Sequence, residues 1–392
     1  MNQASYIYLD HAATTPVRSE VVDAMLPYWT DYYGNPSSVH DLGRNADRGL
    51  TQARETLADL TNSNPEEVIF TASGSESDNL AIRGIMWSAR TSGRGNHLIT
   101  SAIEHKAVLE TAKLLRDLHG FELSIIPVDK YGIVELEVIE RSIRPDTVLI
   151  SIMAANNEIG SVQPFEQIGL LARDHNIQFH SDAVQAAALH SWDFKHLPID
   201  LLTFAAHKFY GPKGIGILIA REDINLTPAI TGGGQEEGRR AGTENVPYAV
   251  GAARAFELAM NERTENIKHY RTLRDRLISG ILKNIPIGCR LTGHPTERLF
   301  NHASFAFENI SGNDLLMHLD LAGIGASSGS ACLVGDPKPS TLLAELGLNE
   351  SWTGGGLRLT VGRQNNIDEV DFAIEKLGEI ALRLQQMRKK FS

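Results

Sequence analysis

Two charged residues stand where predicted strands end, and both could carry out chemistry there. Lys208 follows the apolar run LLTFAA (201–206), and Asp182 follows IQFH (177–180), 26 residues before the lysine. A lysine partly buried at a strand end has a lowered amine pKa, which suits imine formation with a carbonyl compound. A carboxylate there either caps the next helix or holds a cation, and Gln185 is its companion in either role. Taken singly, Lys208 would be interpreted as a surface lysine in a Gly/Pro turn.

Two further polar positions follow predicted strands in the same way. Gly74 and Ser75 come after VIF (68–70) and precede a helical stretch, so backbone N–H groups and a hydroxyl would face an anion such as phosphate. Capping of that helix by Ser75 is the plainer interpretation. His105 comes after HLIT (97–100) at a strand-to-helix junction, where a single histidine is more often structural than catalytic.

In combination, these residues match the requirements of one cofactor, pyridoxal phosphate. The lysine would form the imine, and the aspartate would keep the pyridine nitrogen protonated so that the ring can accept electrons. The helix start would hold the phosphate, and the histidine would stack on the ring or move protons. Because open α/β sheets bind ligands beyond the carboxyl ends of their strands, we expect the four features at one edge of a sheet.

The chain has two cysteines, and only one of them lies in a sequence that favours chemistry. Cys289 fits the usual place of a free cysteine in a core. Cys332 lies in SSGSACLVGDPKPS, among loop-forming residues, which indicates an exposed, mobile nucleophile or redox centre. Two cysteines exclude a disulfide framework and a four-cysteine zinc site, so we expect no metal and a reducing compartment, the cytoplasm.

The pattern of apolar residues predicts how these positions are brought together. Strand-like runs alternate with helical stretches through the first two thirds of the chain, which indicates a mostly parallel sheet covered by helices on both faces. The runs lie at 68–70, 97–100, 123–126, 148–153, 177–180, 201–206 and from 214 onward, with helices at about 76–89 and 164–174. We therefore predict an α/β fold.

Beyond residue 250 the pattern changes to that of a smaller α+β unit. Residues 252–282 are nearly continuous helix by composition, and strand-like runs follow at 303–307 and 357–361. Asn366 and Glu369 form a capping pattern at the start of a final helix. We expect a large domain at 15–260 and a small domain made of 1–14 and 261–392, which carries the cysteine loop.

Composition excludes several classes of function. With 37 Lys+Arg against 48 Asp+Glu, the net charge of −11 argues against a nucleic-acid binder that neutralises phosphates. No apolar run reaches the ~18 residues of a membrane span, and the first residues lack the layout of a signal peptide. The glycines of GPKGIG (211–216) precede a strand, not a helix, which argues against a nucleotide-binding loop.

The motifs of this chain resemble, nearly from end to end, those of the cysteine desulfurases. These are the NifS/IscS-like group of the class-V aminotransferases, which are fold-type I pyridoxal-phosphate enzymes. The motifs that carry the resemblance, in family order, are YLDHAATTP, YGNPSS, FTASGSESDNLAI, TSAIEHKAVL, SIMAANNEIG, HSDAVQ, HKFYGPKGIG, GGGQEEGRRAGTENV and SSGSAC. The resemblance implies an aspartate aminotransferase-like fold and pyridoxal 5'-phosphate as cofactor.

The resemblance also implies a role for each residue of these motifs. Lys208 would bind the cofactor covalently, and His105 would stack over the ring and aid proton transfer. Cys332 would take the sulfur. Asp182 and Gln185 would hold the pyridine nitrogen and the ring hydroxyl. Ser75, with the adjacent Gly74, and His207 would hold the phosphate. Thr243 would reach the phosphate of the other subunit of a homodimer, and Asn157 and Arg358 would hold the substrate carboxylate, which suits the arginine fork.

In the mechanism that the resemblance implies, L-cysteine displaces Lys208, whose freed amine removes the Cα proton. The Cys332 thiolate then attacks the substrate sulfur, which leaves a persulfide on the enzyme and L-alanine as product. The loop swings out to give the sulfur to an acceptor protein, such as an iron–sulfur scaffold or another sulfur carrier. Ala205 departs from the family, which usually has a hydroxyl there. The chain also ends without the family's longer tail, which favours a specialised NifS-like member.

Three other functions are weighed against this one. A selenocysteine lyase, or another pyridoxal-phosphate C–S lyase that does not use Cys332, would share most of the motifs. A sulfur-relay or scaffold protein that keeps the fold would be expected to lose Lys208 or Cys332, and both are present. A nucleotide-dependent enzyme is the remotest alternative, because no GxGxxG follows a strand and opens a helix.

Overall fold

The computed structural model describes residues 6–285, 288–328 and 340–391, and its largest layer is a seven-stranded sheet. The strand order is β2-β8-β7-β6-β5-β3-β4. The strands are β2 (Val68–Thr71), β3 (His97–Ser101), β4 (Glu122–Ile126), β5 (Thr147–Ser151), β6 (Gln178–Asp182), β7 (Leu201–Ala205) and β8 (Gly216–Ala220). Only β8 runs antiparallel to its neighbours β2 and β7, and the other described pairings are parallel. The predicted α/β fold with a mostly parallel sheet is confirmed.

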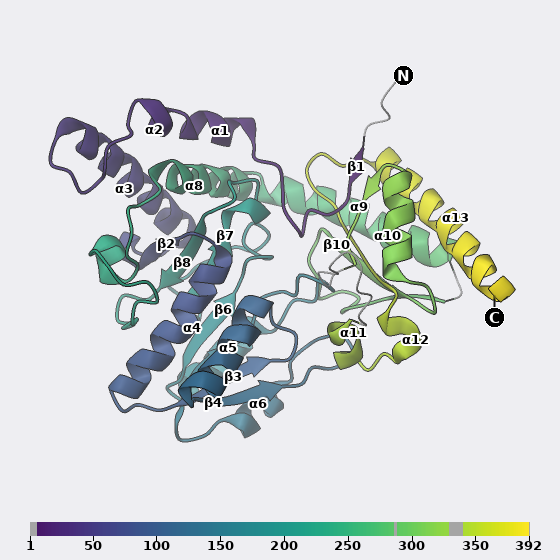
Figure 1. Ribbon diagram of the computed structural model, residues 1–392, viewed down its shortest axis with the longest axis horizontal. Helices are drawn as coiled ribbons and strands as arrows, with labels where there is room; N and C mark the ends of the chain where they lie inside the picture. Colours follow the sequence, from purple (N-terminus) through teal and green to yellow (C-terminus); the bar gives the residue numbers. More distant parts are fainter. Residues whose placement is uncertain (1–5, 286–287, 329–339, 392) are drawn as a thin grey trace.

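Both faces of this sheet are buried, because successive strand residues point to opposite sides. In β2, Val68 and Phe70 join one apolar cluster while Ile69 joins another. The first cluster is completed by α3 (Asp41–Thr61), α6 (Leu136–Ser142), α7 (Phe165–Asp174) and α8 (Val246–Asn261). The second is completed by α4 (Gly74–Thr91) and α5 (Lys106–His119). Figure 1 shows α3 and α8 on one side of the sheet and α4 and α5 on the other.

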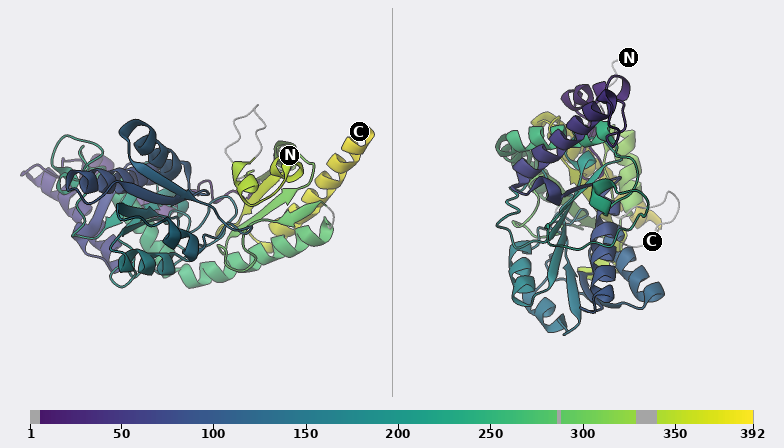
Figure 2. Two further views of the ribbon diagram at one scale, coloured as in Figure 1. Left: turned by 90° about the horizontal axis from the view of Figure 1, so that it is seen from below. Right: turned by 90° about the vertical axis from the view of Figure 1, so that its left-hand side faces the viewer.

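A smaller part of the chain has its own sheets and its own apolar cluster. Strand β10 (His302–Phe307) lies between β9 (Cys289–Leu291) and β12 (Gly356–Thr360) in an antiparallel sheet, and β1 (Ile7–Tyr8) pairs with β11 (Ile324–Gly325). The helices that pack on these sheets are α9 (Arg263–Asn284), α10 (Gly312–Leu321) and α13 (Ile367–Phe391). In Figure 2, α9 and α13 lie on this part, beside each other.

The predicted helix at 252–282 differs from the structure in both its start and its continuity. Helix α8 begins at Val246 and ends at Asn261, and α9 begins at Arg263. Glu262 between them has φ −94° and ψ 1°, outside the α-helical range, so the backbone departs from helical geometry there although its N–H still donates to the Leu258 carbonyl at 3.1 Å. The predicted capping pattern is present: Asn366 Oδ1 accepts from the Glu369 N–H at 3.0 Å, and Glu369 Oε2 accepts from the Asn366 N–H at 3.2 Å.

The remaining short elements connect these layers. They are α1 (Ser19–Met25), α2 (Pro27–Thr30), α11 (Thr341–Glu345), α12 (Glu350–Thr353) and 3₁₀ turns at Pro65–Glu67, Ala206–Lys208 and Gln235–Gly238. Within the described part of the chain, no helix has both the length and the apolar character needed to cross a bilayer. The first described residues connect the two parts: β1 joins the smaller one, and the Thr15 N–H donates to the His207 carbonyl beside the large sheet.

Candidate active site

A cavity of about 240 Å³ opens at the carboxyl ends of the parallel strands. Its walls come from the start of α4, the loops after β3 and β5, the end of β6, and the turn that follows β7. The lining residues are Ser73, Gly74, Ser75, Asp78, His105, Met153, Ala155, Asn157, Asp182, Val184, Gln185, Ala205, His207 and Lys208. The structure therefore brings together, at one edge of the sheet, most of the residues predicted from the sequence.

The Lys208 amine is held by two backbone carbonyls of the N-terminal segment. Its Nζ donates to Ala12 O at 2.6 Å and to Ala13 O at 2.8 Å. Burial, and after it the positive charge of Arg358, lowers the pKa of Lys208 to about 8, against the opposing effect of Asp182 and Asp10. A larger share of the amine is therefore neutral near pH 7.5 than in an exposed lysine, as imine formation requires.

Asp182 and Gln185 face the same cavity from the end of β6 and the turn after it. Asp182 Oδ1 accepts from the Val184 N–H at 2.9 Å. Burial raises the pKa of Asp182, and the hydrogen bond from the Val184 N–H and the positive charge of Lys208 oppose that rise. Gln185 Nε2 donates to Ala12 O at 3.0 Å, so the acceptor that holds the lysine also holds the glutamine.

The start of α4 differs from the expected capping. The N-cap is Ser73, whose Oγ accepts from the Glu76 N–H at 3.1 Å, so the interpretation of Ser75 as the cap is wrong. The reason is that the helix begins at Gly74, one residue before Ser75, and Ser75 lines the cavity instead. A Cβ at Gly74 would lie 3.1 Å from a methyl group of Val184, so glycine lets this turn pack tightly against the cavity wall.

His105 both caps a helix and lines the cavity. Its Nδ1 accepts from the Ala107 N–H at 3.1 Å, which caps α5, while the ring lines the cavity. His207 is fixed differently: its Nδ1 pairs with the Thr14 hydroxyl at 3.2 Å. Burial, then the charges of Lys208 and Lys213, lowers the pKa of His207 to about 4, so the ring is neutral at pH 7.

The two residues expected to hold a substrate carboxylate meet at the side of the smaller part. Arg358 in β12 donates from Nη1 to the Asn157 carbonyl at 2.9 Å and pairs through Nη2 with Asp10 at 2.7 Å. Its buried Nε has no partner among the described residues. The neighbouring Asn156 is a turn residue, with its Oδ1 accepting from two backbone N–H groups.

Three predicted site residues are not among those that line this cavity: Arg358, which contacts the Asn157 carbonyl, Thr243 and Cys332. Thr243 is exposed on the loop between the third 3₁₀ turn and α8 and is not among the lining residues. Cys332 lies outside the described residues. The chain enters its segment beside β12, because Ser327 and Arg358 exchange backbone hydrogen bonds of 3.2 and 2.6 Å. Cys289, expected in the core, lies in β9, and burial raises its thiol pKa to about 12.

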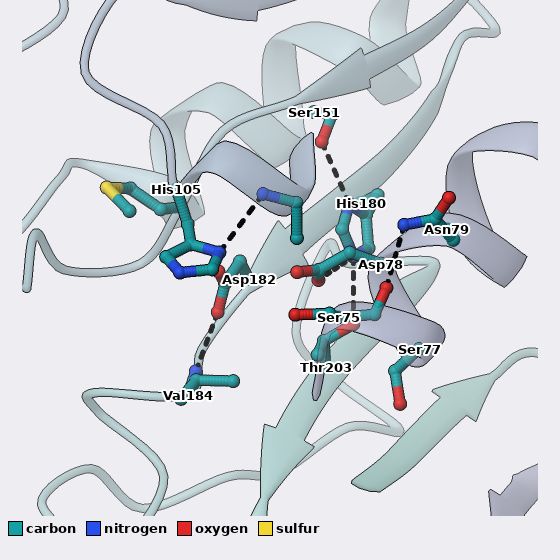
Figure 3. A network of polar contacts seen from close by, with 12 residues as sticks. Ser75, Ser77, Asp78, Asn79, His105, Ser151, His180, Asp182, Val184 and Thr203 are labelled. Atoms are coloured by element: carbon teal, nitrogen blue, oxygen red, sulfur yellow. Dashed lines mark hydrogen bonds and ion pairs between the residues drawn. The ribbon is translucent and has the colours of Figure 1, made fainter. Parts of the chain in front are cut away.

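Three buried groups around the cavity were missed in the sequence: Asp78, Glu104 and His180. Figure 3 shows Asp78 and His180 beside Asp182 and His105. Asp78 is three residues after Ser75 on the same helix, so the helical period was the signal that could have placed it on the cavity side. Glu104 accepts from the Ser101 hydroxyl at 2.5 Å and from the Met153 N–H at 3.0 Å, behind the cavity wall.

The donor set around the cavity fits pyridoxal phosphate. Lys208 offers an amine of lowered pKa, Asp182 a carboxylate for the ring nitrogen, and Ser75 with the first turn of α4 a hydroxyl and N–H groups for the phosphate. The buried Oδ1 of Asp78 has no hydrogen-bond partner among the described residues, which points to a polar occupant in the adjoining space.

Comparisons with known proteins agree with this description. The sequence matches the family model of the class-V aminotransferases over residues 7–372. A relative named cysteine desulfurase IscS, from Methanosarcina thermophila, is 48% identical over 381 residues, which are 97% of this chain and 93% of that protein. The solved structure of a NifS-like protein has a TM-score of 0.90 at 37% identity, and the match covers 97% of this chain and 100% of that one. A structure described as SspA in complex with cysteine has a TM-score of 0.78 at 34% identity, with 91% and 98% covered.

The fold and the matched sequence define a class of enzymes that use pyridoxal phosphate, the class-V aminotransferases. The chain belongs to this family and, within it, to the IscS/NifS-like group. The resemblance drawn from the motifs, and the fold that it implied, are confirmed.

Proposed function

We propose that this protein is a cysteine desulfurase that converts L-cysteine to L-alanine and passes the sulfur to Cys332, then to an acceptor. The observation that carries the proposal is the Lys208 amine, of lowered pKa, in one cavity with Asp182 and close to Arg358. Its relatives over 97% of the chain, which are named cysteine desulfurase IscS, support the same activity. The chain is thereby assigned to the pyridoxal-phosphate-dependent sulfurtransferases.

The cavity residues would hold the cofactor as follows. Asp182 and Gln185 would hold the ring nitrogen and ring hydroxyl, Ser75 with Gly74 and His207 would hold the phosphate, and His105 would stack on the ring. Asn157 would contact both the ring and the substrate. When bound, pyridoxal phosphate supplies an electron sink for the pair left at the substrate Cα. His207 is neutral at pH 7, so its contribution to phosphate binding would be a hydrogen bond and not a charge.

Substrate binding rests on Arg358 and Asn157. The arginine fork suits a carboxylate, and its buried Nε is unpartnered among the described residues. Asp10 now occupies Nη2 at 2.7 Å, so the substrate carboxylate either shares the fork with Asp10 or replaces it. Lys208 Nζ, in its neutral form, accepts the Cα proton and returns it, and His105 assists as a second proton carrier.

In the sulfur step, the Cys332 thiolate attacks the sulfur of the substrate. A sulfur–sulfur bond forms as the substrate Cβ–S bond breaks, and the electron pair of that bond stays on carbon. The carbon then takes a proton, which yields alanine and a persulfide on Cys332 without an external oxidant. Ser327, five residues before Cys332 in the sequence, exchanges backbone hydrogen bonds with Arg358, which supports this order because Cys332 and Arg358 would act on one small substrate.

The partners of the reaction follow from the same proposal. The persulfide requires an acceptor, either an iron–sulfur scaffold or another sulfur-carrying protein. We expect a homodimer in which Thr243, exposed in the single chain, reaches the phosphate bound by the second subunit. We expect a cytoplasmic enzyme, because a reactive free thiol needs a reducing compartment. The division into a domain at 15–260 and one made of 1–14 and 261–392 is proposed with it.

A single-turnover assay tests the function. The protein is mixed with L-cysteine, and alanine and persulfide on Cys332 are measured for the wild type and for Cys332→Ala, with Cys289→Ala as the matched cysteine control. We expect about one alanine and one persulfide per site in wild type and Cys289→Ala, and neither in Cys332→Ala while its cofactor absorbance is retained. Turnover unaffected by Cys332→Ala would contradict the proposal and favour a selenocysteine lyase or another C–S lyase, which selenocysteine as substrate would identify.

A further inference from the structure

Asp78 is a buried acid in the cavity wall that the proposed mechanism does not use. It lies on α4, one turn after Ser75, and is 1% exposed. Its Oδ1 makes no hydrogen bond to a described residue. One nitrogen of His105 and one carboxylate oxygen each of Asp78 and Asp182 lie within 4.8 Å of one another. Asp78 therefore stands beside the group expected to meet the cofactor ring nitrogen.

The imidazole next to Asp78 does not neutralise it. His180 Nε2 lies 3.6 Å from Asp78 Oδ1 but is hydrogen-bonded to the Thr203 hydroxyl at 3.1 Å. The other ring nitrogen, Nδ1, pairs with the Ser151 hydroxyl at 2.8 Å, as Figure 3 shows. Burial lowers the pKa of His180 to about 3, so the ring carries no charge near pH 7.

The other groups that face Asp78 decide its protonation. Burial is the largest cause of a raised Asp78 pKa, and the acids Asp182 and Glu104 raise it further, whereas a hydrogen bond with the Thr203 side chain lowers it. The hydrogen bond from the Val184 N–H and the positive charge of Lys208 act on Asp182, where both favour the ionised form. Two adjacent buried carboxyls cannot both be ionised, so the negative charge stays on Asp182 and the proton on Asp78.

We propose that Asp78 is a positioning residue of the cofactor site, a neutral acid whose hydroxyl orients the Asp182 carboxylate and leaves it the single anion facing the ring nitrogen. This inference rests on the proposed function only in assuming pyridoxal phosphate as the ligand. Asp78 touches neither substrate nor sulfur in this arrangement and acts through Asp182. An amide in its place would keep a donor of similar shape, whereas a methyl group would not.

Cofactor binding to the cofactor-free protein tests the positioning role. Pyridoxal phosphate is titrated by equilibrium dialysis against wild type, Asp78→Asn and Asp78→Ala, with Asp182→Asn as a reference for loss of the anion. We expect Asp78→Asn to bind within about threefold of wild type and Asp78→Ala to bind about tenfold or more weakly, the loss typical of one hydrogen bond to a charged group. Wild-type affinity in Asp78→Ala, or a loss in Asp78→Asn equal to that in Asp78→Ala, would overturn the proposal.

Thermal unfolding of the same cofactor-free proteins reports the protonation state without any ligand. A buried acid of raised pKa binds a proton in the folded state that the unfolded chain has released, so stability falls as pH rises above the ordinary aspartate pKa. We therefore expect the Tm of Asp78→Asn minus that of wild type to increase steadily from pH 5 to pH 8. A difference that is constant or decreases over this range would show an ionised Asp78 and refute the neutral acid. Neither measurement requires cysteine turnover, so a protein that fails the desulfurase assay still returns both results.

Discussion

The charge of Arg358 should control the reactivity of Lys208. At pH 7.5, a pKa of about 8 leaves about a quarter of the Lys208 amines neutral, whereas the ordinary value of 10.5 leaves about one in a thousand. Burial is the larger cause of the lowered pKa and Arg358 the next. Arg358→Gln removes the cation and should raise the Lys208 pKa, so the neutral fraction falls. Arg358→Lys keeps the cation and should leave that pKa nearly unchanged.

The assay is competitive acetylation of the cofactor-free protein from pH 6 to pH 11, with the acetylated fraction of Lys208 measured by mass spectrometry. The exposed Lys213 provides an internal reference for reagent reactivity in the same region of the chain. We expect a wild-type midpoint near 8, an unchanged midpoint in Arg358→Lys, and an upward shift in Arg358→Gln. A wild-type midpoint at 10 or above, or equal midpoints in Arg358→Gln and wild type, would refute the electrostatic reasoning. Circular dichroism of each variant verifies that it is folded.

Three further predictions concern stability. Gly293→Ala should lower the free energy of unfolding by about 2 kcal/mol or more, because φ is +76° and the new Cβ would lie 2.4 Å from a backbone oxygen. Gly323 has φ +81° but no atom within 4 Å of an added Cβ, so Gly323→Ala should lower it by only about 1 kcal/mol. Urea unfolding of both variants measures the difference. Glu236→Gln should lower the free energy of unfolding by about 3 kcal/mol, because the Glu236 side chain is 2% exposed and pairs with an arginine of α3. The side chain of Glu237 is 65% exposed, and an equal loss of stability in Glu237→Gln would contradict this reasoning. Burial is the main cause that raises the pKa of Glu104 to about 8. The folded state therefore loses stability as the pH rises from about 4.5 to 8. The Tm of Glu104→Gln should increase relative to that of wild type over the same range.

The large sheet was predictable because its strands are short apolar runs that end in turn residues. All seven observed strands of the sheet coincide with predicted ones, within a few residues at each end. Helix α3 was not predicted, although it is 21 residues long. Its buried face follows a clear helical period but is built largely from small residues such as Gly43, Ala46 and Gly49, so few large apolar residues mark it in the sequence. A Cβ at Gly49 would lie 2.3 Å from the Tyr28 ring, which explains the small residue there.

Site residues that directly follow a strand were predictable from the sequence. Residues that lie on a helix face, or that are distant in sequence from their partners, were less so. Lys208, Asp182 and His105 could be placed by that rule alone. Asp78 could not, because it lies within a helix, where only its spacing of three residues from Ser75 indicates the cavity side. The pairing of Asp10 with Arg358 joins positions 348 residues apart, and no local pattern encodes it. The roles of the site residues and the domain boundaries stay predictions.

Residues 10–15 connect groups that would act at different steps of the reaction. The Ala12 carbonyl accepts hydrogen bonds from both Lys208 and Gln185, and the Asp10 carboxylate pairs with Arg358. In the proposed reaction, departure of the Lys208 amine from its carbonyls and binding of a carboxylate at Arg358 would both act on this short segment of backbone. Binding of substrate at Arg358 would then affect the cofactor end of the cavity through residues 10–15, without any movement of the sheet. Amide exchange in residues 10–15 would then follow the occupancy of both ends.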